Sequence, residues 1–186
     1  MCTVQFQAVT CSLGSCQAYC LISTKHEGYG HNLVGFSDTD FAGGINNRKS
    51  MSRWNFTFNG APISWASKKQ GLVTHSSMEV ELVVGSIASI ESIWLIRLGK
   101  DFKHDFTPIP MFTDNQSFII FTKNDINDMR TKHIDTHYHY MCKQVNAGNI
   151  QLHYIMSPNN PADILMKPLP PHKHVNLLNN LGIHCV

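Results

Sequence analysis

The segment MFTDNQSFIIF, residues 111–121, holds a single carboxylate, Asp114, between two apolar runs. The first run predicts a buried strand and the second a short helix, so Asp114 lies where the strand ends. Ligands of open sheets bind at the carboxyl ends of strands, which makes Asp114 a candidate metal ligand. An aspartate in front of a helix is also a common N-cap. Both interpretations are open from this segment alone.

Two further aspartates, Asp38 and Asp40, end the segment LVGFSDTD. If the strand continues through them, both share a face with Val34 and Phe36, because side chains alternate along a strand. A carboxylate on such a face costs free energy unless it is paired or binds a metal ion. If the strand has already ended, both aspartates are ordinary turn residues.

Glu79 and Glu81 stand near the start of an apolar segment that predicts a helix over residues 77–99. The tetrapeptide SSME is typical of a capping box, in which Ser76 caps the helix and Glu79 reaches back to its backbone N–H. This gives Glu79 a structural role and leaves Glu81 without one. Residues two apart on a helix point to different sides, so the two glutamates are not expected to act together.

Asp163 follows Pro161 in the first turn of another predicted helix, where the helix dipole by itself favours an acid. Four acids thus lie at the ends of predicted elements: Asp38, Glu81, Asp114 and Asp163. Hard carboxylate oxygens of this kind suit Mg2+ or Mn2+ rather than zinc.

The elements that must position these acids follow from periodicity and turn signals. Strands are expected within residues 33–43, 53–60, 61–69, 108–114 and 149–156, with a hairpin turn at Asn59-Gly60. Helices are expected within residues 77–99, 115–123, 133–148, 159–167 and 172–181. A hairpin meander followed by alternating elements indicates an α/β fold, a mixed sheet with helices packed on it.

Residues 1–30 show no steady period, so we expect a poorly defined lead-in there and one domain over residues 31–186. Within that domain, Tyr138 and Met141 are expected in the core. The three tryptophans, Trp54, Trp65 and Trp94, are also expected to be core aromatics.

Composition limits the class of protein. The chain has 186 residues, is 42% hydrophobic and carries a net charge of +2 with a pI of about 8.2. This suffices for one domain with a core, and the mild basicity is compatible with nucleic-acid contact without requiring it. No apolar stretch reaches the ~18 residues of a membrane span, and the N-terminus lacks a signal-peptide pattern. We therefore expect a soluble intracellular protein with no membrane partner.

Zinc remains a minor alternative at two places. The spacing of Cys11, Cys16 and Cys20 matches no common zinc site, and free thiols are the simpler interpretation. His133 and His137 are four residues apart on an expected helix, but no third ligand is spaced to join them.

Six ordered blocks between residues 35 and 170 resemble the ribonuclease H domain of copia-type LTR-retrotransposon Pol polyproteins. They are GFSDTDFAGG with NRKSMS, PISWASKKQ, SSMEVEL, FTDNQS, RTKHIDTHYHY and PADILMKPLP. The resemblance implies a ribonuclease H-like mixed five-stranded sheet with helices packed on both faces. It also implies a metal-dependent endonuclease that hydrolyses the RNA strand of RNA–DNA hybrids during reverse transcription.

Carried over by motif, the catalytic and metal-binding acids are Asp38, Glu81, Asp114 and Asp163. The capping box and the motif thus choose Glu81 independently. The implied cofactor is Mg2+, with Mn2+ as a substitute, in a two-metal arrangement with the ions about 3.5–4 Å apart. Asp38 would bridge both ions, Glu81 and Asp114 would complete one, and Asp163 the other.

The implied substrate is an RNA–DNA hybrid, selected by its 2′-hydroxyls and A-like shape more than by base sequence. Basic residues that flank the proposed site are the expected phosphate contacts: Lys68, Lys69, Arg130, Lys132 and His133. Each could instead belong to a solvated basic surface. A reverse transcriptase polymerase domain is a further expected partner, and the expected location is a cytoplasmic retroelement particle or the nucleus.

Two other functions are weighed against this one. Departures from the family pattern include Arg53 in place of a glycine, where a turn is expected to be less comfortable. Such drift suggests a catalytically decayed remnant that retains only nucleic-acid binding. A strand-transferring integrase shares the broad fold, but it places its glutamate after the second aspartate, whereas Glu81 precedes Asp114 here.

Overall fold

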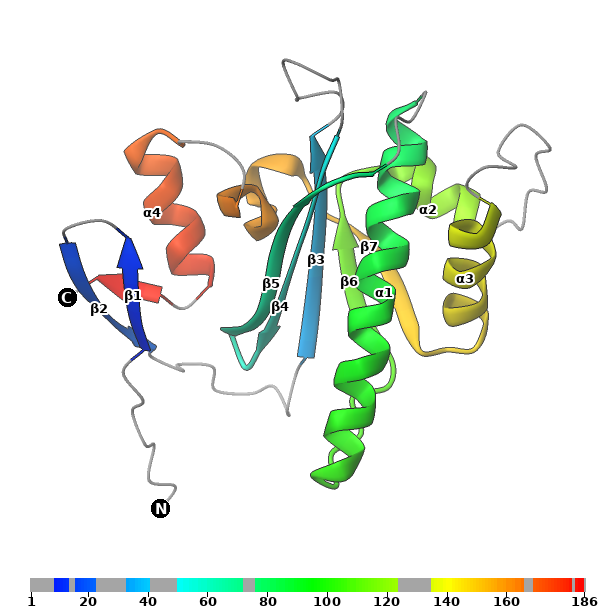
Figure 1. The fold of residues 1–186 in the computed structure, drawn as a ribbon, viewed down its shortest axis with the longest axis horizontal. Coiled ribbons are helices and arrows are strands. Elements are labelled where there is room, and N and C mark those ends of the chain that lie inside the picture. The colour runs from blue at the N-terminus through cyan, green and yellow to red at the C-terminus, as the bar shows by residue number, and fades with distance from the viewer. Residues whose placement is uncertain are drawn as a thin grey trace.

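A computed structural model describes residues 9–13, 16–22, 33–40, 50–71, 76–123, 135–165, 169–181 and 183–185 of the chain. Its main sheet has five strands: β3 (Leu33–Asp40), β4 (Met51–Phe58), β5 (Ala61–Lys69), β6 (Ile109–Thr113) and β7 (Ile150–Tyr154). They lie in the order β5-β4-β3-β6-β7. The pairs β3–β4 and β4–β5 are antiparallel, while β3–β6 and β6–β7 are parallel. The mixed five-stranded sheet is therefore confirmed (Figure 1).

The hairpin between β4 and β5 turns at the two residues expected from sequence. Asn59 has a φ of 49° and Gly60 a φ of 82°, so both adopt the left-handed conformation. Asparagine and glycine tolerate this region best, and two such residues give a turn that matches the twist of the flanking strands.

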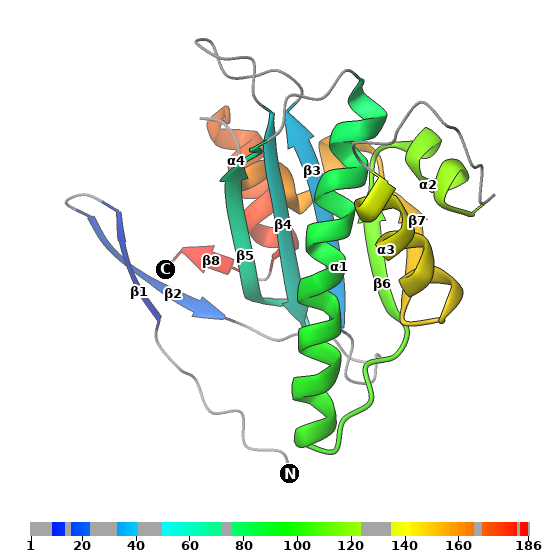
Figure 2. The ribbon, with the colours of Figure 1, turned by 45° about the vertical axis from the view of Figure 1, so that its right-hand side comes forward.

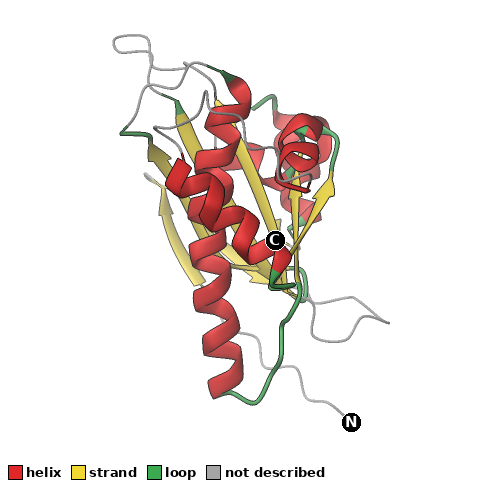
Figure 3. Cartoon of the chain, turned by 90° about the vertical axis from the view of Figure 1, so that its right-hand side faces the viewer, coloured by secondary structure: helices red, strands yellow, loops and turns green. Residues whose placement is uncertain are grey.

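Three helices cover one face of the sheet: α1 (Ser77–Asp101), α2 (Gln116–Lys123) and α3 (Asp135–Asn146). They stand in front of the sheet in Figure 3. The core between these layers is built from apolar side chains that include Phe56, Leu82, Met111, Phe118, Tyr138 and Met141. Helix α1 approaches α2 closely at Gly85, where an added Cβ would lie 2.6 Å from the Phe118 ring.

Two 3-10 helices, η2 (Ser157–Asn159) and η3 (Pro161–Leu165), and one α-helix, α4 (Pro171–Asn180), follow β7. Helix η3 contacts β3, β4 and α4 on the face opposite to α1, so helices lie on both faces as expected (Figure 2). The α-helix expected over residues 159–167 is wrong in type, because residues 161–165 form the tighter 3-10 turn. Asn160 fixes this segment, since its side-chain NH2 donates to the Ser37 carbonyl at 2.9 Å.

The expectation that no stretch is long and apolar enough to cross a membrane is wrong for helix α1. It has 25 residues and meets that test by length and composition. In the protein, 61% of its most apolar window is buried, chiefly against the sheet. This is the behaviour of a core helix.

Residues 9–22, which show no period in the sequence, hold two strands, β1 (Val9–Leu13) and β2 (Cys16–Ile22). Strand β2 also pairs with β8 (Ile183–Cys185), so the segment joins the end of the chain in a second, three-stranded sheet. No residue of β1, β2 or β8 pairs with the five-stranded sheet in the described ranges. The domain boundary near residue 30 stays a prediction.

The tryptophans divide between core and surface. Trp54 is buried, but Trp65 and Trp94 are 56% and 53% exposed, so their expected place in the core is wrong. Trp65 lies on the edge strand β5 and Trp94 on the solvent side of α1. Tyr138 and Met141 are buried, as expected.

Candidate active site

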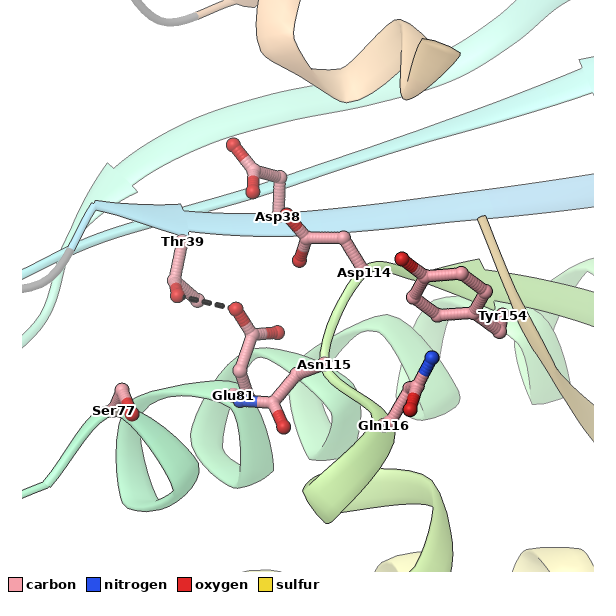
Figure 4. Close-up of a pocket in the computed structure, with 8 residues that line it drawn as sticks. All are labelled: Asp38, Thr39, Ser77, Glu81, Asp114, Asn115, Gln116 and Tyr154. Carbon is pink, nitrogen blue, oxygen red and sulfur yellow. Dashed lines mark hydrogen bonds between the residues drawn. The ribbon is translucent and has the colours of Figure 1, made fainter. Parts of the chain in front are cut away.

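Three of the four predicted acids converge at one end of the sheet. Asp38, Glu81 and Asp114 each offer a carboxylate oxygen, and these oxygens lie within 4.8 Å of one another. We call these three residues the acidic triad. It lines an open cleft of about 440 Å³, with Thr39, Ser77, Asn115, Gln116 and Tyr154 on its walls (Figure 4).

Asp38 lies inside strand β3, so the alternative that it belongs to a turn is excluded. Its side chain is buried, and in Figure 4 it stands on the opposite side of β3 from Thr39 and Glu81. Burial, followed by the charges of Asp114 and Asp163, raises the pKa of Asp38 to about 7, while Arg53 lowers it. An additional cation nearby would therefore stabilise the ionised form of the Asp38 carboxyl group.

Glu81 reaches the triad from helix α1 and is 4% exposed. The Thr39 hydroxyl donates to its Oε1 at 2.5 Å, and the Thr113 hydroxyl donates to its Oε2 at 3.4 Å. Burial raises the pKa of Glu81 to about 8, and these two hydrogen bonds act in the opposite direction. Glu79 is absent from the triad, and its backbone N–H donates to Ser76 Oγ at 3.2 Å, which confirms the N-cap.

Asp114 follows the last residue of β6 and does not cap the next helix. The side chain of Asn115 accepts from the Phe118 N–H at 3.0 Å and supplies the cap of α2. Asp114 instead accepts from the Ser157 hydroxyl at 2.5 Å and faces the other two acids. The capping role expected as one alternative for Asp114 is therefore wrong, and its role as a metal ligand stays a prediction.

Asp163 lies beside the triad without joining it. It stands in η3, on the face of the sheet opposite to α1, and its Oδ2 accepts from Lys173 Nζ at 3.2 Å. Its charge nevertheless contributes to the raised pKa of Asp38. The structure thus brings together three of the four predicted ligands and holds the fourth in an ion pair.

Arg53 was expected to disturb a turn, and this is wrong, because it lies within strand β4 directly opposite Asp38. Its side chain is 2% exposed. Arg53 Nη1 lies 3.5 Å from Asp38 Oδ2, and Nη2 lies 3.9 Å from Asp40 Oδ2. Arg53 is thus a buried cation at the edge of the acidic triad.

The predicted basic contacts fall into two groups. Lys68 and Lys69 are exposed at the end of β5, and the register Thr39–Ser52–Lys68 places Lys68 two strands from the triad, roughly 10 Å away. Lys68 Nζ also lies 5.6 Å from the Trp54 ring centroid. Arg130, Lys132 and His133 lie outside the described residues.

The zinc alternatives receive no support from the described residues. His137 Nδ1 lies 3.0 Å from the Ser86 hydroxyl, so the ring packs against α1, where burial lowers its pKa. In the described part of the chain, the one metal-capable group of His, Cys, Asp and Glu is the acidic triad. Cys142 is buried, and its thiol donates to the Thr122 carbonyl at 3.6 Å. Cys11, Cys16 and Cys20 are described only as parts of strands.

Sequence reasoning missed several residues of the cleft. Thr39 lies between the two aspartates and, because alternation points it to the other face, it meets Glu81. Gln116 stands within the DNQS block, so the motif offered a signal. Tyr154 ends β7, the strand beside β6, and its place follows only from the parallel pairing of these strands.

Comparison with known proteins supports the resemblance to ribonuclease H domains of Pol polyproteins. No protein-family model matches the chain. The retrovirus-related Pol polyprotein from transposon TNT 1-94 of Nicotiana tabacum is 37% identical over 152 residues, which cover 82% of this chain and 11% of that protein. The Pol polyprotein from transposon RE2 of Arabidopsis thaliana is 31% identical over 82% of this chain and 10% of its own length. The chain therefore spans about a tenth of the length of these Pol polyproteins.

Solved structures with the same fold are ribonucleases H. The N-terminal RNase H domain of rv2228c from Mycobacterium tuberculosis aligns with a TM-score of 0.55 at 10% identity, covering 81% of this chain and 98% of that chain. RNase H1 from Halobacterium salinarum aligns with a TM-score of 0.50 at 10% identity, over 70% of this chain and 90% of its own. LC11-RNase H1, solved in complex with an RNA/DNA hybrid, also has a TM-score of 0.50 at 10% identity, over 69% and 88%.

The five-stranded sheet and the helices that cover it show that the chain has the ribonuclease H fold. Its sequence relatives are Pol polyproteins of transposons, and its resemblance to the ribonuclease H domain of such a polyprotein is confirmed.

Proposed function

We propose that this chain is the ribonuclease H of a copia-type retrotransposon and hydrolyses the RNA strand of RNA–DNA hybrids during reverse transcription. The observation that carries the proposal is the acidic triad, which combines three convergent carboxylates with an open cleft on a ribonuclease H fold. Pol polyprotein relatives supply the biological setting.

The donor set fits a divalent cation. Three carboxylates provide hard oxygen ligands, which Mg2+ and Mn2+ prefer. Two of these groups, Asp38 and Glu81, have raised pKa values because they are buried among acids. A bound cation in such a site supplies charge neutralisation and lowers the pKa of an attacking water.

The residues of the chain have distinct roles in this proposal. Asp38, Glu81 and Asp114 hold the cation, and the Thr39 and Thr113 hydroxyls orient the Glu81 carboxylate. The Ser157 hydroxyl does the same for Asp114. These hydrogen bonds fix the carboxylates before substrate arrives, which reduces the cost of organising the site. Asp163, next to Asp38, is the proposed fourth acid.

The substrate lies across the cleft in this proposal. Lys68 and Lys69, at the same end of the sheet as the triad, contact phosphates, together with Arg130, Lys132 and His133. The RNA strand is recognised by its 2′-hydroxyls and the A-like shape of the hybrid. A reverse transcriptase polymerase domain is the proposed partner that delivers hybrids.

The experiment that tests the function uses a hybrid labelled on the RNA strand, with the full chain in Mg2+, Mn2+ or EDTA. We expect cleavage of the RNA strand with either metal, none in EDTA, and none of an all-DNA duplex of the same sequence. Binding of the hybrid without cleavage in both metals would instead identify a decayed remnant and overturn the proposal.

A further inference from the structure

Cations are distributed unevenly around the acidic triad. On the η3 face of the sheet, Arg53 lies beside Asp38 and Asp40, and Lys173 pairs with Asp163. On the α1 face, the Glu81 carboxylate is held by two threonine hydroxyls. Among the residues that the structure describes, no lysine or arginine forms a salt bridge with Glu81 or Asp114. Within the part of the chain that the structure describes, the salt bridges of the site therefore lie on the η3 side of Asp38.

Arg53 is committed to this place by its burial. A guanidinium that is 2% exposed cannot be hydrated, so it depends on nearby carboxylates for its charge. Its two contacts, 3.5 Å to Asp38 and 3.9 Å to Asp40, are longer than ideal charge-assisted hydrogen bonds. The Nε donor is buried without a hydrogen-bond partner. Arg53 thus places a positive charge among several acids and does not form a close bidentate salt bridge.

The charge of Arg53 interacts with the acidic residues on the η3 side of the sheet. Burial lowers the pKa of Arg53, and the charges of Asp38, Asp40 and Asp163 act in the opposite direction, each favouring its protonated form. A second metal ion on this side, as two-metal catalysis requires, would need oxygens from Asp38 and Asp163. Both carboxylates already lie against protein cations, which such an ion would have to displace or tolerate as like-charged neighbours.

We propose that Arg53 supplies the positive charge on the η3 side of the site and thereby opposes the binding of a metal ion there. The free protein then binds one divalent ion among Asp38, Glu81 and Asp114, and it binds a second ion only weakly. This inference rests on the proposed function, because it concerns the metal occupancy of that active site. Arg53 is a positioning and specificity residue here: it sets the number of ions that bind.

The test counts Mn2+ ions bound to the full chain, by the loss of the EPR signal of free Mn2+ and by calorimetry. Arg53→Gln removes the charge and keeps a polar side chain of similar reach. Arg97→Gln is the matched control, because it makes the same change at an exposed position of α1, sixteen residues and roughly 24 Å along the helix from Glu81. Melting temperatures with and without Mn2+ show that each variant is folded.

We expect one Mn2+ per chain for the wild type and for Arg97→Gln, and two for Arg53→Gln, with a second affinity at least tenfold tighter than in the wild type. Arg53→Gln should also gain more in melting temperature from Mn2+, because the ion replaces a lost charge. If Arg53→Gln does not fold, Lys173→Ala, on a half-buried position of α4, frees Asp163 and should also strengthen the second affinity.

Two ions of similar affinity in the wild type, or one ion in both wild type and Arg53→Gln, would overturn the role of Arg53. Neither result affects the proposed function, which needs the first ion and hybrid cleavage. An absence of Mn2+ binding in every variant would overturn the metal site itself, and the proposed function with it.

Discussion

Asn115 caps helix α2, and its neighbour Asp114 is thereby left to face Asp38 and Glu81. The two residues are adjacent in sequence and both are good N-caps, so composition alone does not separate them. The structure assigns the cap to the Asn115 amide and leaves the Asp114 carboxylate facing the other two acids. This division of roles makes Asp114 available for chemistry at the carboxyl end of β6.

The stability of the metal-free protein should fall as pH rises from about 4 to about 8. The folded state holds protons on Asp38, with its pKa raised from 3.8 to about 7, and on Glu81, raised from 4.5 to about 8, that the unfolded state has lost. Raising pH therefore removes up to about 1.4 kcal/mol per pH unit for each retained proton. Urea midpoints in EDTA measure this, and Glu81→Gln should flatten the dependence. A midpoint that rises over this window would show that both acids are ionised in the folded protein.

Thr39→Val should weaken Mn2+ binding, because Glu81 loses the hydroxyl that donates to its Oε1. A hydrogen bond to a charged group contributes about 1.5–3 kcal/mol, so we expect a loss of affinity on the order of tenfold or more. Valine suits a strand, so the fold should remain. Thr39→Ser keeps the hydroxyl and should bind like the wild type. Equal affinities of the valine and serine variants would place the orientation of Glu81 elsewhere.

Affinity for an RNA–DNA hybrid should fall steeply with salt, because phosphate contacts dominate such binding. Replacing Lys68 and Lys69 by Ala should flatten the slope of log affinity against log salt by about one unit per lost contact. The same reasoning applies to Arg130 and Lys132. Fluorescence anisotropy across a salt series measures the slope, and Lys143→Ala, at an exposed position of α3, is the control. A slope that does not change would place the end of β5 away from the substrate.

Deleting residues 1–30 should leave the melting temperature nearly unchanged. In the described part of the chain, every residue of the main hydrophobic core lies between Leu33 and Leu152, and β1 and β2 pair only with each other and with β8. The deletion therefore removes no strand of the five-stranded sheet. Differential scanning calorimetry compares the two chains. A drop of many degrees in melting temperature would show that residues 1–30 belong to the domain and that the predicted boundary is wrong.

Local signals were sufficient to predict the elements that position the site. The β4–β5 turn follows from Asn59-Gly60 because few other residues adopt two successive positive φ angles. The start of α1 follows from the Ser76 cap, which also distinguishes Glu79 from Glu81. These features depend on contacts within a few residues, and such contacts are visible in a sequence.

Features that depend on distant partners were not predictable in the same way. Arg53 was expected only to make a turn less comfortable, because its contacts with Asp38 and Asp40 arise from the register of β3 on β4. Asp163 was placed among the ligands, while its ion pair with Lys173 depends on how α4 packs on η3. The pairing of β2 with β8 joins the two ends of the chain, and neither segment carries a strong period of its own.

The most direct test of the account compares Asp114→Asn with Glu79→Gln in the same hybrid-cleavage and urea-unfolding assays. Asp114→Asn should abolish Mg2+-dependent cleavage and leave stability equal or higher, because it removes one charge from a like-charged cluster. Glu79→Gln should keep cleavage and lose a few tenths to ~1 kcal/mol of stability through a weaker helix start. Cleavage by Asp114→Asn would contradict the account, as would an inactive Glu79→Gln beside an active Glu81→Gln.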